Sequence, residues 1–248
     1  MNKDNIITVL VSVIASVAFS VALASTVVGK APVAAAGNTQ DMNQAIEDYL
    51  MNNPLKIREA LELAAQQEQI EAQKRVALNY KANLEELNNA SNSPFVGPKD
   101  AKITVVEFYD FNCGYCRRLA PELMKVIKNN KDVKFVFKPV TFLGSMPIAR
   151  AALAANKKGK FLEVYEAFMT HNGQVTSDVI DEVITKVGLD AAEIKEIAAS
   201  EEITKALSAI SELSQKVEVR GVPTLVINGE PLQAIEEGPI QQAIDSLK

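Results

Sequence analysis

Residues 103–116 read ITVVEFYDFNCGYC, and this stretch decides the fold. Its first half is rich in β-branched and aromatic residues, which predicts a buried strand over Lys102–Asp110. A helix is expected over Cys113–Asn129, with a kink at Pro121. The strand therefore delivers Cys113 to the start of a helix, where the partial positive charge of the helix N-terminus favours thiolate over thiol. The thiolate is the attacking species in disulfide exchange.

Cys113 and Cys116 are the only two cysteines of the chain. Tetrahedral zinc needs four ligands, and the chain offers no third cysteine and a single histidine, His171, which we interpret as a helix-end or loop residue. A structural disulfide between the pair closes too short a loop to constrain the unfolded chain much. Dithiol redox chemistry is therefore the leading hypothesis. Two alternatives stay open: a Cu(I)-binding thiol protein, since soft thiolates select that ion, and a membrane-tethered scaffold with a vestigial redox site.

The N-terminus predicts export. Residues 1–24 are interpreted as a signal peptide that ends in the A-x-A pattern Ala22-Leu23-Ala24. The alternative is an uncleaved membrane anchor to about residue 30, because the uncharged run is long enough to span a bilayer. Either way the rest of the chain lies outside the cytosol, where disulfide chemistry is needed. The net charge of −5 and the lack of a basic patch argue against a nucleic-acid partner.

Residues 38–92 predict a helical arm and a linker. Asn52-Asn53-Pro54 breaks a first helix and starts a second, which is expected to run to about Leu87. Apolar residues recur every seven positions along the second helix, as a weak heptad pattern. They are Leu63, Ile70, Ala77 and Leu84. We predict that the arm makes the protein a homodimer or homotrimer; packing of the arm on its own catalytic domain is the alternative.

Residues 94–248 alternate between strand and helix signals, which predicts an α/β domain. A second strand is expected over Val133–Lys138, and the signals are then helical from about 144 to 217. The predicted order ends with two strands and a helix, over Pro223–Asn228, Leu232–Ala234 and Pro239–Leu247. The long helical stretch between the second and third strands indicates an insertion.

This order and the Cys-Gly-Tyr-Cys motif resemble the DsbA family of periplasmic thiol:disulfide interchange proteins. Leu143-Gly144-Ser145 resembles the family's entry into its helical insert, and Gly221-Val222-Pro223-Thr224 resembles the loop that bears its cis-proline. The resemblance covers about residues 94–248 and implies a thioredoxin-like fold with an inserted helical domain. The preceding helical arm resembles that of the oligomeric, N-terminally extended members, including the ScsC type.

The resemblance assigns a task to each site residue. Cys113 is expected to be the exposed nucleophile, and Cys116 the buried thiol that resolves the mixed disulfide. Pro223, in the cis form, is expected to lie against the disulfide and to present the backbone of Val222 to a substrate peptide. Glu107 occupies the position of the family's buried acid, where a carboxylate of raised pKa can take the proton of Cys116.

Substrate contacts are expected from Tyr115 and Thr224 as well as from Val222. No cofactor is expected beyond the redox-active disulfide, and no metal site. The implied partners are unfolded or misoxidised exported proteins, together with a quinone-linked membrane oxidase, a transmembrane reductase, or both.

The residues between the cysteines depart from the archetypal oxidase, which has proline and histidine there. Gly114 and Tyr115 are instead the pair carried by dimeric disulfide isomerases of the DsbC type, whereas Val222 before the proline resembles the oxidases. A less oxidising couple keeps more sites reduced, and isomerisation starts from a reduced thiolate. The sequence therefore predicts both oxidase and isomerase capacity.

Overall fold

The computed structural model describes residues 39–89, 91 and 93–248. The predicted signal peptide, or anchor, lies outside the described residues. Within the described part of the chain, no helix combines the length and the apolar character needed to cross a bilayer. The chain divides into two compact units between Gln67 and Glu68.

The first unit contains helix α2 (Thr39–Asn52) and the beginning of α3 (Pro54–Ala82). Pro54 opens α3, as the sequence predicted, because a proline at the first helical position loses no hydrogen bond. None of the residues of α2 is buried. Both helices expose large apolar side chains, which are Met42, Ile46, Tyr49, Leu50, Met51, Leu55, Ile57, Leu61 and Leu63. These side chains therefore have no core of their own in a single chain.

The second unit is built on a five-stranded sheet of order β1-β3-β2-β4-β5. The strands are β1 (Phe95–Val96), β2 (Thr104–Tyr109), β3 (Lys134–Pro139), β4 (Thr224–Ile227) and β5 (Glu230–Leu232). The β2–β3 pair is parallel, and the other three pairs are antiparallel. Every residue of β2 is buried, which confirms the predicted central strand and explains its continuous apolar run.

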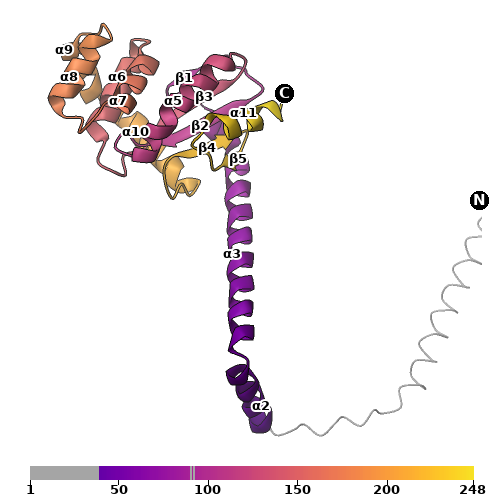
Figure 1. Ribbon diagram of the computed structural model, residues 1–248. Helices are drawn as coiled ribbons and strands as arrows, with labels where there is room; N and C mark the ends of the chain where they lie inside the picture. Colours follow the sequence, from indigo (N-terminus) through magenta and orange to yellow (C-terminus); the bar gives the residue numbers. More distant parts are fainter. Residues whose placement is uncertain (1–38, 90, 92) are drawn as a thin grey trace, which may run out of the picture. The chain divides into compact units, whose positions relative to one another are not determined.

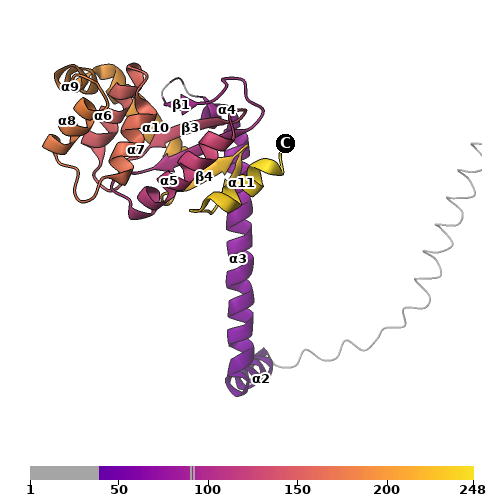
Figure 2. The same ribbon diagram turned by 45° about the horizontal axis from the view of Figure 1, so that its top comes forward.

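Helices cover both faces of the sheet (Figures 1 and 2). On one face, α5 (Gly114–Asn129) and α11 (Glu237–Asp245) pack with most of the helical insert in the larger core cluster. On the other face, the end of α3, α4 (Leu84–Asn88) and the end of α10 form a second cluster with the sheet. This second cluster includes Tyr80, Leu87 and Phe108.

The helical insert lies between β3 and β4 and confirms the predicted helical stretch. Its helices are α6 (Met146–Lys157), α7 (Phe161–Thr170), α8 (Ser177–Lys186), α9 (Ala191–Ala199) and α10 (Glu201–Lys216). Side-chain caps set two of the boundaries. Asp190 accepts a hydrogen bond from the backbone of Glu193 at the start of α9, and Ser200 does the same for Ile203 at the start of α10. The result is a thioredoxin-like fold with an inserted helical domain.

The structure differs from the sequence-based expectation mainly around residues 68–96. The second arm helix ends at Ala82 and a separate short helix, α4, follows. Tyr80 and Leu87 are buried against the sheet, and the ammonium groups of Lys134 and Lys138 donate to backbone carbonyls at the end of α4. This part of the expected arm therefore packs on its own domain, since its apolar side chains find the sheet. The edge strand β1 was not predicted, because two residues carry no periodicity.

Candidate active site

A short turn connects β2 to α5 and places Cys113 at the helix start. The buried carboxylate of Asp110 fixes this turn, because its two oxygens accept hydrogen bonds from the backbone N–H groups of Asn112 and Leu143, both at 2.8 Å. The N–H of Cys113 donates to the carbonyl of Asp110 at 3.0 Å. Cys113 is thereby the N-cap of α5, as the sequence predicted. The helix dipole acts on its sulfur from this position.

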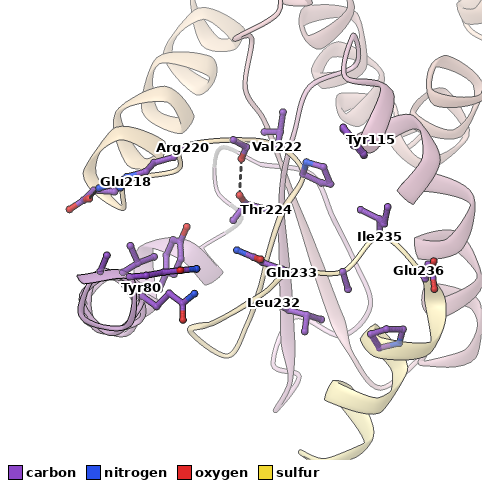
Figure 3. Close-up of a pocket in the computed structure, with 18 residues that line it drawn as sticks. Tyr80, Tyr115, Glu218, Arg220, Val222, Thr224, Leu232, Gln233, Ile235 and Glu236 are labelled. Atoms are coloured by element: carbon purple, nitrogen blue, oxygen red, sulfur yellow. Dashed lines mark hydrogen bonds and ion pairs between the residues drawn. The ribbon is translucent and has the colours of Figure 1, made fainter. Parts of the chain in front are cut away.

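Cys113 lies against the loop between α10 and β4. Its thiol donates to the carbonyl oxygen of Val222 at 3.3 Å, and the Val222–Pro223 peptide bond is cis. The hydroxyl of Thr224 donates to the carbonyl of Gly221 at 2.7 Å and closes the loop (Figure 3). The structure therefore brings together the two motifs that the sequence singled out, although 109 residues separate Cys113 from Val222.

The exposure expected for Cys113 needs a correction. Only 6% of the residue is exposed, because the Val222 loop lies over it and the side chain packs in the larger core cluster. Cys116, one helical turn further in, is fully buried. The two thiols therefore differ in access, as expected, but Cys113 is itself mostly covered. Both are present as free thiols.

Burial changes the acid–base behaviour of Cys116. Desolvation raises the pKa of its thiol far above the ordinary range, and the nearby carboxylate of Glu107 raises it further. A backbone hydrogen bond in the Asp110 turn acts in the opposite direction but is the weaker influence. Cys116 therefore needs a proton acceptor close by before it can attack a disulfide.

Glu107 is the carboxylate on the buried side of the pair. It lies on β2 and is buried, and desolvation raises the pKa of its carboxyl to about 8. The hydroxyl of Tyr165 donates to its two oxygens, at 2.9 and 3.2 Å, and lowers that pKa. The predicted burial of Glu107 is confirmed. A carboxyl of this pKa can exchange a proton near neutral pH.

Tyr165 is a site residue that sequence reasoning missed. It lies on α7 of the helical insert, inside a cluster of aromatic rings that pack in edge-to-face and tilted pairs. The members of the cluster are Tyr109, Phe111, Phe137, Phe161, Tyr165 and Phe168. The hydroxyl of Tyr109 is buried and has no hydrogen-bond partner among the described residues. The rings exclude water from the surroundings of Glu107, which explains its raised pKa.

The outer surface near the pair is partly apolar. Tyr115 is 58% exposed, and the guanidinium of Arg118 lies 5.0 Å from the centre of its ring. Phe142 and Leu143 are exposed on the neighbouring loop, whereas Phe111 is in the core. Tyr115 is therefore placed to meet a partner, while Phe111 is a packing residue.

His171 lies at the end of α7 and does not join the site. It is the C-cap residue of that helix. The guanidinium of Arg117 donates to the carbonyl of His171 and to those of Met169 and Gly173, which ties α5 to the end of α7. Among the described residues, no group of three or more histidine, cysteine or acidic side chains is arranged to hold a metal ion.

Comparisons with known proteins agree with this geometry. Residues 88–246 match the family described as Thioredoxin. The chain is 26% identical to the Na⁺/H⁺ antiporter NhaA 1 of Salinispora arenicola, over 54% of this chain but only 21% of that protein. It is 28% identical to disulfide bond formation protein D of Bacillus subtilis, over 56% of this chain and 69% of the relative. The chain thus spans about a fifth of the length of the antiporter relative.

Two solved structures show the same fold. A thioredoxin-like oxidoreductase from Silicibacter pomeroyi is 31% identical, with a TM-score of 0.60 over 64% of this chain and 94% of that one. A linker-deletion mutant of Proteus mirabilis ScsC is 25% identical, with a TM-score of 0.63 over 88% of this chain and 98% of that one. The chain belongs to the thioredoxin family, with a DsbA-like fold that carries a helical insert and N-terminal helices.

Proposed function

We propose that this protein is an exported oxidoreductase that forms and isomerises disulfide bonds in other periplasmic proteins through Cys113 and Cys116. One observation carries the proposal. A thiol at a helix start faces a cis-proline loop, and a second, buried thiol lies behind it beside a carboxylate of raised pKa. In that arrangement Cys113 exchanges bonds with the client on the outer side, and Cys116 and Glu107 resolve the mixed disulfide on the inner side.

In the oxidising direction, a client thiolate attacks the sulfur of Cys113 in the Cys113–Cys116 disulfide. The S–S bond breaks, and Cys116 leaves as a thiolate that takes a proton from Glu107. A second client thiolate then attacks the mixed disulfide at the client sulfur and expels Cys113. The client loses two electrons and gains a disulfide, and the protein is left with two reduced cysteines.

Isomerisation begins from the reduced protein. The Cys113 thiolate attacks a wrong client disulfide, and the freed client thiolate attacks another disulfide of the same client. The client thiolate released in that step attacks the mixed disulfide at the client sulfur and expels the Cys113 thiolate. If the client stalls, Glu107 takes the proton of Cys116, which then attacks Cys113 and releases the client. Val222, Thr224 and Tyr115 are the proposed substrate contacts, and Pro223 shapes the loop that carries Val222 and Thr224.

The exposed apolar side chains of α2 and of α3 up to Gln67 support self-association as a homodimer or homotrimer. Several active sites in one assembly raise the effective thiol concentration at a bound client. The double variant Ile46→Glu, Leu50→Glu is expected to be monomeric by sedimentation equilibrium, with its thiol exchange intact. An unchanged mass would remove these residues from the interface.

The activity is tested by refolding a scrambled multi-disulfide protein. Wild type is expected to restore the native pairing, and the monomeric variant to do so more slowly. Deleting residues 39–67 is a cleaner control than deleting the whole expected arm, because Tyr80 and Leu87 belong to the core. No reshuffling by wild type would eliminate isomerisation, and no thiol exchange at all would eliminate the proposed function. Alkylation of the thiols in intact cells would show whether an oxidase or a reductase resets the site.

A further inference from the structure

We infer that the second half of α3 forms one wall of a groove that binds an extended polypeptide segment next to Cys113. The inference rests on the proposed function, since the bound segment is the part of a client that flanks its reactive cysteine. It adds a specificity-determining surface on a helix that precedes the catalytic fold. All 18 residues that line the groove lie in the second compact unit (Figure 3).

The groove opens where strands β4 and β5 separate. Their ladder ends at the pair Leu225–Leu232. Beyond that pair, residues 222–224 run toward Cys113 and residues 233–236 run toward α11, and both segments line a groove of about 760 Å³. Tyr115 of α5, which stands between the two cysteines in the sequence, also lines the groove (Figure 3). Backbone of this kind beside a sheet edge suits an added extended chain, which binds through main-chain hydrogen bonds.

Helix α3 supplies the opposite wall from one of its faces. Its lining residues are Gln69, Ala72, Gln73, Val76 and Tyr80, which recur at helical spacing. Tyr80 is buried and Val76 is partly buried, so they hold the helix on the body, while Gln69 and Gln73 remain exposed. Asn79 and Lys81 fix the same turn, through a hydrogen bond to the carbonyl of Lys216 and an ion pair with Glu230. The wall is therefore anchored at one end and free to contact a ligand at the other.

The chemistry of the lining matches a polypeptide without a strong charge. Glu218 and Arg220 form an ion pair with each other at 2.8 Å and so compensate each other's charge, which leaves Glu236 as the remaining charged residue of the lining. Gln69, Gln73 and Gln233 offer amides that both donate and accept. Apolar contacts come from Val222 and Leu232 among others. The amides of such a lining can hydrogen-bond to a peptide backbone, and its apolar residues can contact apolar side chains. Unfolded clients expose both.

The groove is continuous with the redox site, and this indicates that its occupant is the client segment next to the reactive cysteine. Val222 lines the groove and accepts the hydrogen bond of the Cys113 thiol. A client cysteine bonded to Cys113 must therefore place its neighbouring residues along this loop. The segment that follows enters the groove between α3 and residues 233–236.

The test measures exchange of the full chain with two disulfides of different size. One is oxidised glutathione, and the other is a ten-residue uncharged peptide that carries a mixed disulfide with glutathione. Gln73→Trp and Ala72→Trp fill the groove and are expected to slow exchange with the peptide by about tenfold, or about 1.4 kcal/mol. Exchange with glutathione should stay unchanged. Lys74→Trp is the matched control, since Lys74 lies on the other side of α3 in a surface ion pair with Glu71.

The outcomes separate the two proposals. Equal peptide rates for wild type and both groove variants would overturn the groove while leaving the redox function in place. Failure of wild type to exchange with either disulfide would instead remove the proposed function. Loss of both rates in a variant, with altered circular dichroism, would report misfolding, and the Gln73→Ala variant would then decide. Its truncated wall should weaken peptide exchange without disturbing the helix, and an unchanged rate would count against the groove.

Discussion

The outer and inner sides of the Cys113–Cys116 pair have opposite characters. The outer side consists of Cys113, the Val222 loop and the exposed ring of Tyr115. The inner side consists of Cys116, Glu107 and the aromatic cluster, all closed to solvent. The outer side has partner-facing surface and the inner side has a titratable carboxyl. The contrast indicates that bond exchange and proton transfer are separated by one turn of helix.

The largest expected effect on thiol exchange comes from removing each of the two sulfurs in turn. Cys113→Ser should lose all exchange with protein disulfides, because no thiolate remains on the outer side. Cys116→Ser should still attack but accumulate mixed disulfides, because nothing on the inner side releases the partner. Non-reducing gels of the two variants mixed with a client distinguish these outcomes. Mixed disulfides through Cys116 in the Cys113→Ser variant would contradict the proposal that only Cys113 reacts with the client.

Removing the inner carboxyl should affect resolution but not attack. In Glu107→Gln, Cys116 loses its proton acceptor, and release of a mixed disulfide should slow by about 10²-fold. In wild type the release rate should rise with pH, reach half of its maximum near pH 8, where Glu107 is half ionised, and level off above that pH. The variant should lack this rise. Glu166→Gln, an exposed change on α7, is the control, and stopped-flow measurement of partner release is the assay.

The same carboxyl should lower stability as pH rises. Its pKa is about 8 in the folded chain and 4.5 in its ordinary state, so the folded protein binds more protons than the unfolded one between these values. The contribution of Glu107 to folding is therefore fully present below pH 4.5 and lost as pH rises through 8. Urea unfolding of the reduced proteins should show Glu107→Gln gaining roughly 3.5 kcal/mol relative to wild type between pH 5 and pH 8. A constant difference would show that Glu107 stays charged in the fold.

The outer side of the pair was largely predictable from the sequence, and the inner side was predictable only in part. Cys113, Cys116 and Pro223 stand in short motifs whose local geometry is encoded nearby. Glu107 was identified because it occupies the position of the DsbA family's buried acid, in an otherwise apolar strand. The strand and helix order followed from periodicity and caps, such as Asp190 before α9.

Contacts between distant segments were not predictable from local patterns. Tyr165 lies 58 residues after Glu107, in a short helix where it looks like any aromatic core residue. The docking of Tyr80 and Leu87 on the sheet was missed for a related reason. A helical apolar stripe is the same whether its partner is a second chain or the helix's own domain. Burial of Cys113 likewise depends on the Val222 loop, far along the sequence.

The smallest effect tests whether the helical insert takes part in proton transfer. Tyr165→Phe removes a hydrogen bond that lowers the pKa of Glu107. The carboxyl should then ionise at higher pH, so release of a mixed disulfide at pH 7 should slow by about fivefold, the value of roughly one hydrogen bond. The plateau rate should be kept, but it should be reached at a higher pH than in wild type. A change in the plateau alone would indicate disturbed packing.

Tyr109→Phe is the matched control, because its hydroxyl lies in the same aromatic cluster but has no partner among the described residues. Removing an unsatisfied buried hydroxyl should leave the pH profile of release in place and the stability equal or slightly higher. If both variants give the wild-type profile, Tyr165 is a packing residue and the inner side acts through Glu107 alone. If only Tyr165→Phe shifts the profile, α7 sets the pH at which Cys116 can release a client. In that case the insert tunes the reaction as well as covering the core.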